Sequence, residues 1–549
     1  MDYYNTTHSQ HVGTTITTPL GILYSISNSR MALLFIMLGA VFLWWQPSVT
    51  MDSFEPPLLK PIVPYIGHII GFFRRQTKYL EILHQRSPKA IYTLPMLQKK
   101  IYVITSPDLV QKVFRSNDFS FEPFMIEFSQ RLLGASDETM EPTRRTPKDP
   151  MEPSFVQQVL KDIHTSLTGE ALNQLNLATL NSFAATMNAA EDALRIESLY
   201  VWLRSNFTIA TTDHLFGRAH NPMRSSPNMV ESYWEFENNL PPLLLGFFPL
   251  IIARKAHKGR QEIKVALSKY YIARHHLQPG AAQITKHRAA LCEKAGMSDH
   301  NTGEFELGLL HGALANTPPI LFWLLVHILS SPSATTSIRN ELLGIITSSP
   351  SVNEEREVTV DISKFESHCP TLVSAYRETL RLTNSHISPR RVMVDTCIAD
   401  ETTSYQLKAG ADIMMPSAVT QLSADIWGPS VKDFDAGRFL SPSQKSKAGQ
   451  DGTSSRNNKT RKQAYYPFGG GKHLCPGRNI AFAPCLGVVA VLLLGFEVEG
   501  TDGGLLEVPE IRTVKFGEAV AKPFGEGLRL GALMERKQGF ERVSWRFIS

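Results

Sequence analysis

The stretch "YYPFGGGKHLCPGRNIA", residues 465–481, places a lone cysteine, Cys475, in a glycine-rich loop just ahead of a long apolar run. A thiol in such a loop can be a core residue, half of a disulfide, a zinc ligand, a redox nucleophile or a haem ligand. Each of these roles makes a different demand on the rest of the chain, so the rest of the sequence has to decide among them.

Composition narrows the class of protein. The chain has 549 residues, of which 43% are hydrophobic and 19% charged, which is ordinary for a globular enzyme. The length favours roughly two to four domains, unless one large fold is present. The net charge of +5 is small and no basic-aromatic stripe occurs, so we expect no nucleic-acid partner.

The cysteines argue against two of the alternatives for Cys475. There are five of them, spread widely: Cys292, Cys369, Cys397, Cys475 and Cys485. Their number is odd and no Cys-x-x-Cys pair occurs, which is atypical of a disulfide framework or a structural zinc site. The pattern favours a reducing compartment for the main part of the chain.

The N-terminal region predicts a membrane anchor. A polar segment is followed by the uncharged run "MALLFIMLGAVFLWW" at Met31–Trp45. This run is shorter than the ~20 residues of a full span, but a tryptophan pair closes it as an interfacial pair would. A cleaved signal peptide and a core helix of a soluble domain are the alternatives. Basic residues are more frequent downstream, so the positive-inside rule puts the tail in the lumen, where the sequon at Asn5 would be exposed.

We expect four regions: a polar lumenal tail over 1–30, a transmembrane signal anchor over 31–46, a proline-rich hinge over 47–64 and a catalytic domain over 65–549. Proline fixes φ and lacks a donor, so "EPPLLKPIVP" predicts a stiff connector. Helical periodicity then dominates, and β-forming residues return near "SPRRVMVDT" and "SYQLKAGADIMMP". The predicted fold class is mainly α with minor β.

Two further segments point to surfaces. The apolar stretch Leu240–Ile252 contains three prolines and is either a buried loop or a surface loop that dips into a membrane beside an entry channel. Ser441–Ala464 is polar and basic, so we interpret it as a flexible surface insertion, with docking of an acidic partner as a weaker hypothesis.

The loop around Cys475 has what a thiolate ligand of haem iron needs. Glycine permits close approach to a flat macrocycle, and backbone N–H groups can point at the sulfur. A helix that starts just after the cysteine adds a positive dipole end, which favours thiolate. Cys485 fits an isolated core cysteine, whereas Cys475 does not, because a core cysteine needs no such glycine spacing.

The motif F-x-x-G-x-x-x-C-x-G, here Phe468, Gly471, Cys475 and Gly477, resembles the cysteine loop of the cytochrome P-450 family of haem-thiolate monooxygenases. The resemblance covers the chain from about residue 56 onward. It implies one large haem domain in which Cys475 binds the iron of haem b. The family usually has an arginine two residues before the cysteine, paired with a haem propionate. His473 stands there in this chain, and the charge of a histidine depends on pH.

Three distant residues resemble the family's structural cluster. Glu378 and Arg381 match its E-x-x-R motif, and their spacing puts both charges on one face of a helix. Arg438 in "FDAGRF" matches its F-x-P-x-R-F segment, with Ala436 in place of proline. The resemblance implies a buried cluster in which one carboxylate accepts hydrogen bonds from two arginines and so locks the scaffold behind Cys475.

An arginine at the start of the next strand reaches a propionate in the family. Arg390 and Arg391 are adjacent in "SPRRVMVDT" and point to opposite faces of a strand, so only one of them can do this, and we favour Arg390. The family's Trp-x-x-x-Arg pair in an early helix has no counterpart that we identify, so that propionate contact stays unassigned.

The helical pattern over Phe305–Pro332 has Pro318 and Pro319 in its middle, so the helix must kink, widen or break in two. In the family an acid–alcohol pair lies here beside the iron, and Asn316-Thr317 takes its place. Thr317 can donate a hydrogen bond to bound oxygen, whereas Asn316 cannot carry a proton as a carboxylate would. The string A-N-T-P-P is similar to the branch of sterol 7α-hydroxylases and prostacyclin synthase.

The resemblance implies a monooxygenase anchored in the endoplasmic reticulum membrane with its catalytic domain in the cytosol. Electrons would come from NADPH through NADPH–cytochrome P-450 reductase. One atom of O2 would enter an apolar small molecule, such as a sterol, a terpenoid or a polyketide of secondary metabolism. The alternatives are a reductase-independent haem-thiolate isomerase or dehydratase, which the missing acid at Asn316 favours, and a non-enzymatic haem carrier or sensor.

Overall fold

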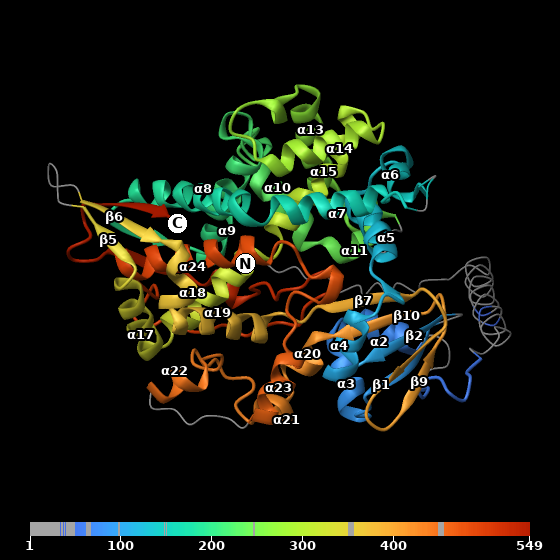
Figure 1. Ribbon diagram of the computed structural model, residues 1–549. Coiled ribbons are helices and arrows are strands. Elements are labelled where there is room, and N and C mark those ends of the chain that lie inside the picture. The colour runs from blue at the N-terminus through green and yellow to red at the C-terminus, as the bar shows by residue number, and fades with distance from the viewer. Residues whose placement is uncertain are drawn as a thin grey trace, which may run out of the picture.

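The structure, a computed structural model, describes residues 50–61, 67–96, 99–147, 149, 151–244, 248–349, 356–447 and 455–549, together with Leu33, Met37 and Gly39. The predicted anchor over 31–46 lies outside the described residues apart from those three positions. Figure 1 shows a molecule built mainly from helices, with its largest sheet at one side. The predicted fold class, mainly α with minor β, is confirmed.

Helices carry most of the described chain. They are α2 (Gly67–Arg75), α3 (Lys78–Arg86), α4 (Pro107–Arg115), α5 (Glu122–Leu133), α6 (Asp137–Arg144), α7 (Phe155–Ser166), α8 (Gly169–Asn188), α9 (Leu199–Phe216), α10 (Met229–Asn238), α11 (Leu240–Leu244), α12 (Pro249–Ile252), α13 (Arg254–Ile272), α14 (Gln283–Lys294), α15 (Asp299–Leu314), α16 (Thr317–Leu329), α17 (Pro332–Leu343), α18 (Phe365–His368), α19 (Pro370–Thr383), α20 (Ser417–Gln421), α21 (Ala424–Trp427), α22 (Pro442–Lys447), α23 (Ser455–Ala464), α24 (Arg478–Gly495) and α25 (Glu526–Arg529). Five short 3-10 helices join them: η1 (Arg218–His220), η2 (Pro222–Arg224), η3 (His275–Leu277), η4 (Ile362–Lys364) and η5 (Gly471–His473).

The strands form four small sheets. They are β1 (Ile91–Met96), β2 (Lys99–Ile104), β3 (Phe119–Ser120), β4 (Ala193–Ile196), β5 (Ile346–Ser348), β6 (Arg356–Asp361), β7 (Ile387–Val392), β8 (Thr396–Ala399), β9 (Ser404–Leu407), β10 (Asp412–Pro416), β11 (Phe496–Glu499), β12 (Ala532–Arg536) and β13 (Val543–Ile548). The largest has the order β1-β2-β10-β7-β3, and the others are β11-β12-β4, β13-β6-β5 and β8-β9. In the largest sheet β7 is an inner strand between β10 and β3, and its successive residues point to opposite faces of the sheet.

Two apolar helices form the centre of the main core. Every residue of α16 is buried, and α24 is buried from Ala483 to Gly495. The spans Asp299–Leu329 and Arg478–Gly495 are long and apolar enough to cross a membrane, but 89% and 78% of their most apolar windows lie inside the protein. A helix that is apolar all round suits the core of a large domain equally well, and burial assigns both spans to the core.

Part of the expected hinge lies on the largest sheet. The backbone N–H of Leu59 donates to the carbonyl oxygen of Thr93 in β1 at 2.9 Å. Glu55 is buried, and both of its carboxylate oxygens accept from Lys100 Nζ in β2 at 2.7 Å. A buried, hydrogen-bonded ion pair holds its segment firmly, so residues 50–61 are attached to the catalytic domain.

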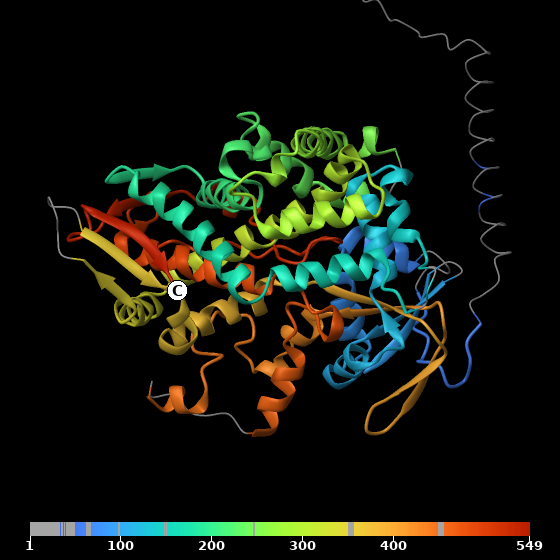
Figure 2. The same cartoon turned by 45° about the horizontal axis from the view of Figure 1, so that its top comes forward.

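Half of the predicted surface insertion is an attached helix. Figures 1 and 2 show α22 and α23 at the lower edge of the molecule. In α23, Arg461 Nε donates to the carbonyl oxygen of Ile426 at 3.0 Å, and its guanidinium lies over the ring of Trp427. Residues 455–464 are thus ordered, contrary to the expectation of a flexible insertion, because contacts with α21 outweigh a polar composition. Residues 448–454 lie outside the described part.

Candidate functional site

The Cys475 loop joins η5 to α24. The N–H of Cys475 donates to the carbonyl oxygen of Phe468 at 3.0 Å, and that of Leu474 donates to the carbonyl oxygen of Gly471 at 3.1 Å. The helix α24 begins three residues after the cysteine, so its positive N-terminal end lies next to the sulfur. The predicted loop residues Phe468, Gly471, Cys475 and Gly477 therefore occupy one tight turn ahead of a long helix.

Close packing against the neighbouring helix α4 leaves no room for a side chain at two of the loop glycines. A Cβ on Gly471, whose φ is +65°, would lie 1.8 Å from the carbonyl oxygen of Phe114 in α4. A Cβ on Gly470 would lie 2.3 Å from the ring of Phe114. By contrast, a Cβ on Gly477 would meet only the sulfur of Cys475, at 3.8 Å. Contact with α4 is thus a reason for glycine that the sequence did not reveal.

Backbone donors act on the sulfur of Cys475. Desolvation raises the pKa of this thiol, and the N–H groups of Gly477 and Arg478 oppose that rise because they stabilise the thiolate. Among the described cysteines only Cys397 and Cys475 are exposed. A metal cation at the sulfur would deprotonate it outright, so this thiol is suited to be a ligand.

The predicted Glu–Arg–Arg cluster forms. Arg381 donates from Nε and Nη2 to the two carboxylate oxygens of Glu378, both at 2.7 Å, and Arg438 Nε donates to Glu378 Oε1 at 2.8 Å. Glu378 and Arg381 are both fully buried. Arg381 Nη1 also donates to the carbonyl oxygen of Gln421 at 2.8 Å. Glu378 therefore ties α19 to the segment of Arg438, and Arg381 ties α19 to the end of α20.

Two hydrogen bonds connect α19 to the start of the Cys475 loop. Asn384 Nδ2 donates to the carbonyl oxygen of Pro467 at 2.9 Å, and the Tyr465 hydroxyl donates to the carbonyl oxygen of Arg377 at 3.1 Å. Sequence reasoning missed Asn384, although its position just after α19 was a signal, since a side-chain amide at a helix end commonly bonds to nearby backbone.

Arg390 lies directly beside the Cys475 loop. It is 4% exposed, and its Nη2 donates to the carbonyl oxygen of Gly470 at 3.2 Å. The guanidinium lies over the rings of Phe114 and Phe121, at 5.2 and 5.6 Å from their centres. Burial lowers the pKa of Arg390 to about 10, so it stays charged at neutral pH. Within the described part of the chain no carboxylate pairs with it.

Arg391 faces the other side of β7 and is already paired. Its Nε donates to Asp412 Oδ1 at 2.9 Å, and its Nη1 donates to Glu127 Oε1 at 3.0 Å. Of the two adjacent arginines, only Arg390 has a guanidinium that is open to an anionic partner.

His473 is a neutral group in this structure. Its Nε2 accepts a hydrogen bond from the N–H of Phe121 at 3.4 Å, which requires the ring proton to be on Nδ1. Burial lowers the pKa of His473 to about 4, and the positive charges of Arg390 and Lys472 add to the effect. At neutral pH His473 therefore offers a propionate one N–H donor and no charge.

The predicted interruption of the long helix is present. The helix α15 ends at Leu314 and α16 begins at Thr317. Ala315 and Asn316 between them keep right-handed helical dihedrals, so the two segments continue in nearly one direction. Thr317 is 6% exposed and Asn316 partly exposed. Pro318 and Pro319 lack backbone donors and so interrupt the hydrogen bonds of the helix here, but the chain continues in the same direction.

One face of α15 borders open space. Gly312 is exposed, and a Cβ on it would meet no atom within 4 Å. Leu309, Ala313 and Asn316 are partly exposed, and their spacing puts them on the same face as Gly312. The rest of this helix is largely buried, so the open face is a lining surface.

Comparison with known families gives a direct result. The family model for Cytochrome P450 matches residues 56–514. The chain belongs to the cytochrome P450 family. Within it the chain is an enzyme of the cytochrome P450 monooxygenase class, because its relatives are named as such.

Three relatives show how closely this cytochrome P450 resembles others. A cytochrome P450 monooxygenase of Gibberella zeae is 33% identical over 522 residues, which cover 94% of this chain and 95% of that protein. Cytochrome P450 monooxygenase nodJ of Hypoxylon pulicicidum is 28% identical over 501 residues, 90% of this chain and 93% of that protein. A cholesterol 7-alpha-monooxygenase of Cricetulus griseus is 23% identical over 485 residues, 86% of this chain and 92% of that protein. The predicted similarity to the sterol 7α-hydroxylase branch is thereby confirmed.

The residues of this cytochrome P450 fit a haem group, which its family uses together with O2. Cys475 presents an exposed thiol with backbone donors at its sulfur. Arg390 presents a buried positive charge that no described carboxylate neutralises. Open space lies beside Gly312. A flat, anionic, iron-carrying group matches this donor set on all three counts.

Proposed function

We propose that this cytochrome P450 inserts one oxygen atom of O2 into an apolar sterol, terpenoid or polyketide, with electrons from NADPH through NADPH–cytochrome P450 reductase. One observation carries the proposal: the unpaired guanidinium of Arg390 donates to Gly470 in the loop that holds the exposed thiol of Cys475. A site for an anionic group and a site for a metal thus share one short loop.

The proposed roles follow the geometry. Haem, when bound, supplies the oxygen-activating iron. Cys475 would hold that iron through its thiolate, inside the turn formed by Phe468, Gly471 and Gly477. This turn keeps the backbone N–H groups of Gly477 and Arg478 close to the sulfur.

The propionates would meet Arg390, with His473 Nδ1 as a second, uncharged donor. Arg391 is occupied by its own ion pairs and holds the strand in place. The cluster of Glu378, Arg381 and Arg438 is structural and fixes α19 behind the Cys475 loop.

Proton handling would fall to the Asn316-Thr317 pair. The Thr317 hydroxyl can hold and donate a proton, and the Asn316 amide can orient a water beside it. Neither group is a carboxylate, so we infer that the proton comes from water held at the interruption between α15 and α16.

We propose attachment to the endoplasmic reticulum membrane by one span. The lumenal tail would be 1–30, the span 31–46, the connector 47–64 and the cytosolic catalytic domain 65–549. Exposed apolar side chains support a second contact: Phe73 on α2, and Leu250 and Ile251 on α12, are 71%, 67% and 78% exposed. Exposed apolar side chains suit a lipid interface, and those of α12 favour the membrane-facing interpretation of Leu240–Ile252.

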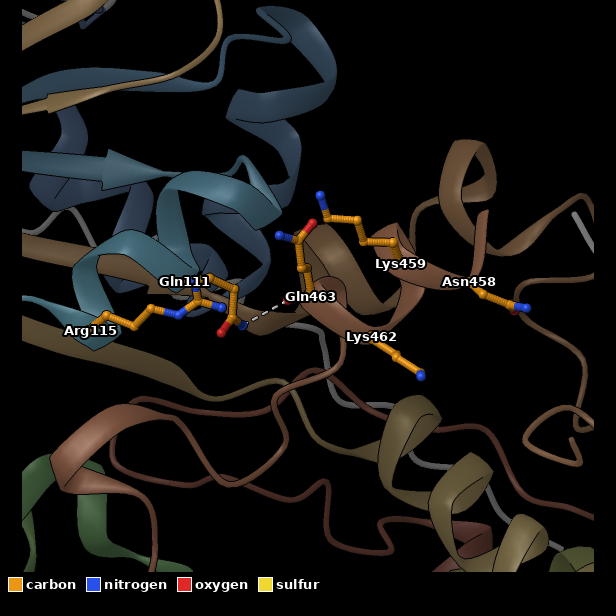
Figure 3. A pocket seen from close by; sticks show the side chains of 6 residues that line it. All are labelled: Gln111, Arg115, Asn458, Lys459, Lys462 and Gln463. Carbon is orange, nitrogen blue, oxygen red and sulfur yellow. Dashed lines mark hydrogen bonds between the residues drawn. The ribbon is translucent and has the colours of Figure 1, made fainter. Parts of the chain in front are cut away.

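A basic pocket supports docking of the reductase. Figure 3 shows Gln111 and Arg115 of α4 beside α23, which contributes Lys459 and Lys462 to the pocket lining, and the hydrogen bond from Gln111 to the Gln463 carbonyl oxygen. Arg115 directly follows Phe114, the residue that contacts Gly470 and Gly471. An acidic electron-transfer protein bound here would lie close to the Cys475 loop, and opposite charge would speed its association.

The test uses microsomes that contain the full chain, co-expressed with reductase, and a panel of labelled sterols, terpenoids and polyketides under ¹⁸O2. We expect one labelled oxygen in the product and an absolute requirement for NADPH. Product formed without NADPH or reductase would overturn the proposal in favour of an isomerase or dehydratase. A protein that binds haem and shows no substrate-induced spin shift with any compound would favour a carrier or sensor.

A further inference from the structure

A buried ionic network joins α10 to the chain segment before β12. Lys522 Nζ donates to a carboxylate oxygen of Glu237, to the Glu237 carbonyl oxygen at 3.3 Å and to Glu518 Oε1 at 3.4 Å. Glu518 also accepts two hydrogen bonds from Arg512 Nη2, at 2.9 and 3.0 Å. Lys522, Glu237 and Glu518 are all less than a tenth exposed. Two cations and two carboxylates balance, so the network as a whole is neutral.

Polar atoms around this network have no partner. The hydroxyls of Tyr200 and Tyr233 and Nδ1 of His311 are buried and make no hydrogen bond within the described part of the chain. The charge of Glu237 adds to burial in raising the pKa of both tyrosines, so both lie near that carboxylate. Buried polar groups in proteins nearly always find a hydrogen-bond partner, so these three atoms have capacity to bind a further polar group.

His311 lies beside the network and next to the exposed Gly312 in the sequence of α15. The residue is partly exposed, and the centre of its ring lies 6.1 Å from that of Phe236 in α10. Asn316 follows five residues later, about 7.5 Å along the helix axis at 1.5 Å per residue. Five residues also turn the helix by about 140°, so His311 lies about one and a half turns before the Asn316-Thr317 pair, on the side of α15 that faces Phe236.

The chemistry of the ring limits what it can bind. Burial lowers the pKa of His311 to about 3, and the nearby charge of Lys522 adds to the effect, so the imidazole is neutral. A neutral imidazole has one N–H donor and one acceptor nitrogen, which match a hydroxyl group. Lys522 already donates hydrogen bonds to three acceptors. The residue before it, Ala521, is fixed because Trp323 Nε1 donates to its carbonyl oxygen at 2.7 Å.

We propose that His311 binds a hydroxyl group of an otherwise apolar substrate and so selects the carbon that is oxidised. The network of Lys522, Glu237 and Glu518 positions α10 and the segment before β12 around it. This inference rests on the proposed function, because it assumes that the partly exposed edge of His311 borders the substrate site. It deepens that function by giving the substrate class a required oxygen at a fixed distance from the reacting carbon.

The experiment compares ligand pairs that differ by one hydroxyl: cholestanol with cholestane, and ferruginol with abietatriene. Dissociation constants are measured from the spin-state shift of the haem-loaded full chain. The variants are His311→Phe and His311→Gln, and the control is His327→Phe, because His327 is also buried without partners but stacks on Phe434 away from the network. The CO difference band and the unfolding midpoint verify that each variant is folded.

We expect the wild type and the control to bind one alcohol at least tenfold more tightly than its hydrocarbon, a difference of about 1.4 kcal/mol. His311→Phe should abolish that preference without weakening hydrocarbon binding, and His311→Gln should restore part of it. An unchanged preference in His311→Phe would overturn the proposal, as would a wild type with no preference in either pair. In both cases an NADPH-dependent, ¹⁸O-labelled product would leave the proposed function standing.

Discussion

Three of the four glycines near Cys475 should differ sharply in their tolerance of alanine. Gly471 has a positive φ and no room for a Cβ, which would lie 1.8 Å from the backbone oxygen of Phe114. Gly469 has a positive φ of +72° but adequate room, since its Cβ would lie 3.6 Å from Ser388 Oγ. Gly477 has an ordinary φ of −76° and open surroundings. Alanine therefore tests conformation and sterics separately.

The magnitudes follow from these differences. A left-handed conformation costs an L-residue about 1–2 kcal/mol, so Gly469→Ala should lower the free energy of unfolding by that amount. Gly471→Ala adds a clash with backbone, which typically costs about 1–3 kcal/mol more, for a total of about 2–5 kcal/mol. Gly477→Ala should cost less than about 1 kcal/mol from protein contacts. The free energy of unfolding of a domain is only about 5–15 kcal/mol, so Gly471→Ala should remove a large part of the stability.

Urea unfolding and the thiolate-type CO difference band measure the outcome. Gly470→Ala supplies an internal check, because its clash is with the Phe114 ring and should be relieved by Phe114→Ala, whereas the clash of Gly471→Ala should not. If Gly471→Ala were no more destabilising than Gly469→Ala, contact with α4 would not be what requires glycine there. Loss of haem in Gly477→Ala without loss of stability would show that its glycine serves the cofactor.

Four further predictions test other parts of the protein. Cys475→Ala should abolish the thiolate-type CO band, and Thr317→Ala should uncouple NADPH oxidation from product, as measured by product per NADPH. His327 has its pKa lowered by burial to about 4, so between pH 6.5 and 4 the unfolded state binds the extra proton. Stability should therefore fall as pH falls, by up to about 1.4 kcal/mol per pH unit from this group. In urea unfolding His327→Phe should reduce that slope, and an equal slope would contradict the assignment. Lys459→Glu with Lys462→Glu should slow reduction by the reductase at low salt and lose the salt dependence, while Lys89→Glu, an exposed control outside the pocket, should not.

Local patterns predicted the parts of the site that are close together in sequence. The loop around Cys475 and the pairing of Glu378 with Arg381 depend on short spacings, which are visible in the amino-acid sequence. The choice between Arg390 and Arg391 was half predictable, because strand alternation shows that they diverge. Which one is free depends on Asp412 and Glu127, and only the folded sheet shows that both carboxylates meet Arg391.

Long-range polar contacts were beyond the sequence. Lys522 and Glu237 are 285 positions apart, and nothing in either segment marks the other as its partner. A buried charge is tolerated wherever opposite charges and donors converge in three dimensions, and short sequence patterns do not show where they converge. Gly470 and Gly471 are likewise required by contact with Phe114 of α4. That helix lies roughly 350 residues earlier in the chain, as the separation of 352 between the bonded residues Gln111 and Gln463 shows.

The departure at His473 has a local cause that an arginine could not satisfy. The N–H of Phe121 precedes α5 and lacks an intrahelical acceptor, as the first donors of any helix do. His473 Nε2 accepts from it at 3.4 Å, and an arginine has no acceptor to offer. The same ring leaves Nδ1–H for a propionate, so the histidine exchanges one fixed charge for a link between α5 and the Cys475 loop. Arg390 then provides a buried permanent cation beside this loop, with its guanidinium over the ring of Phe121.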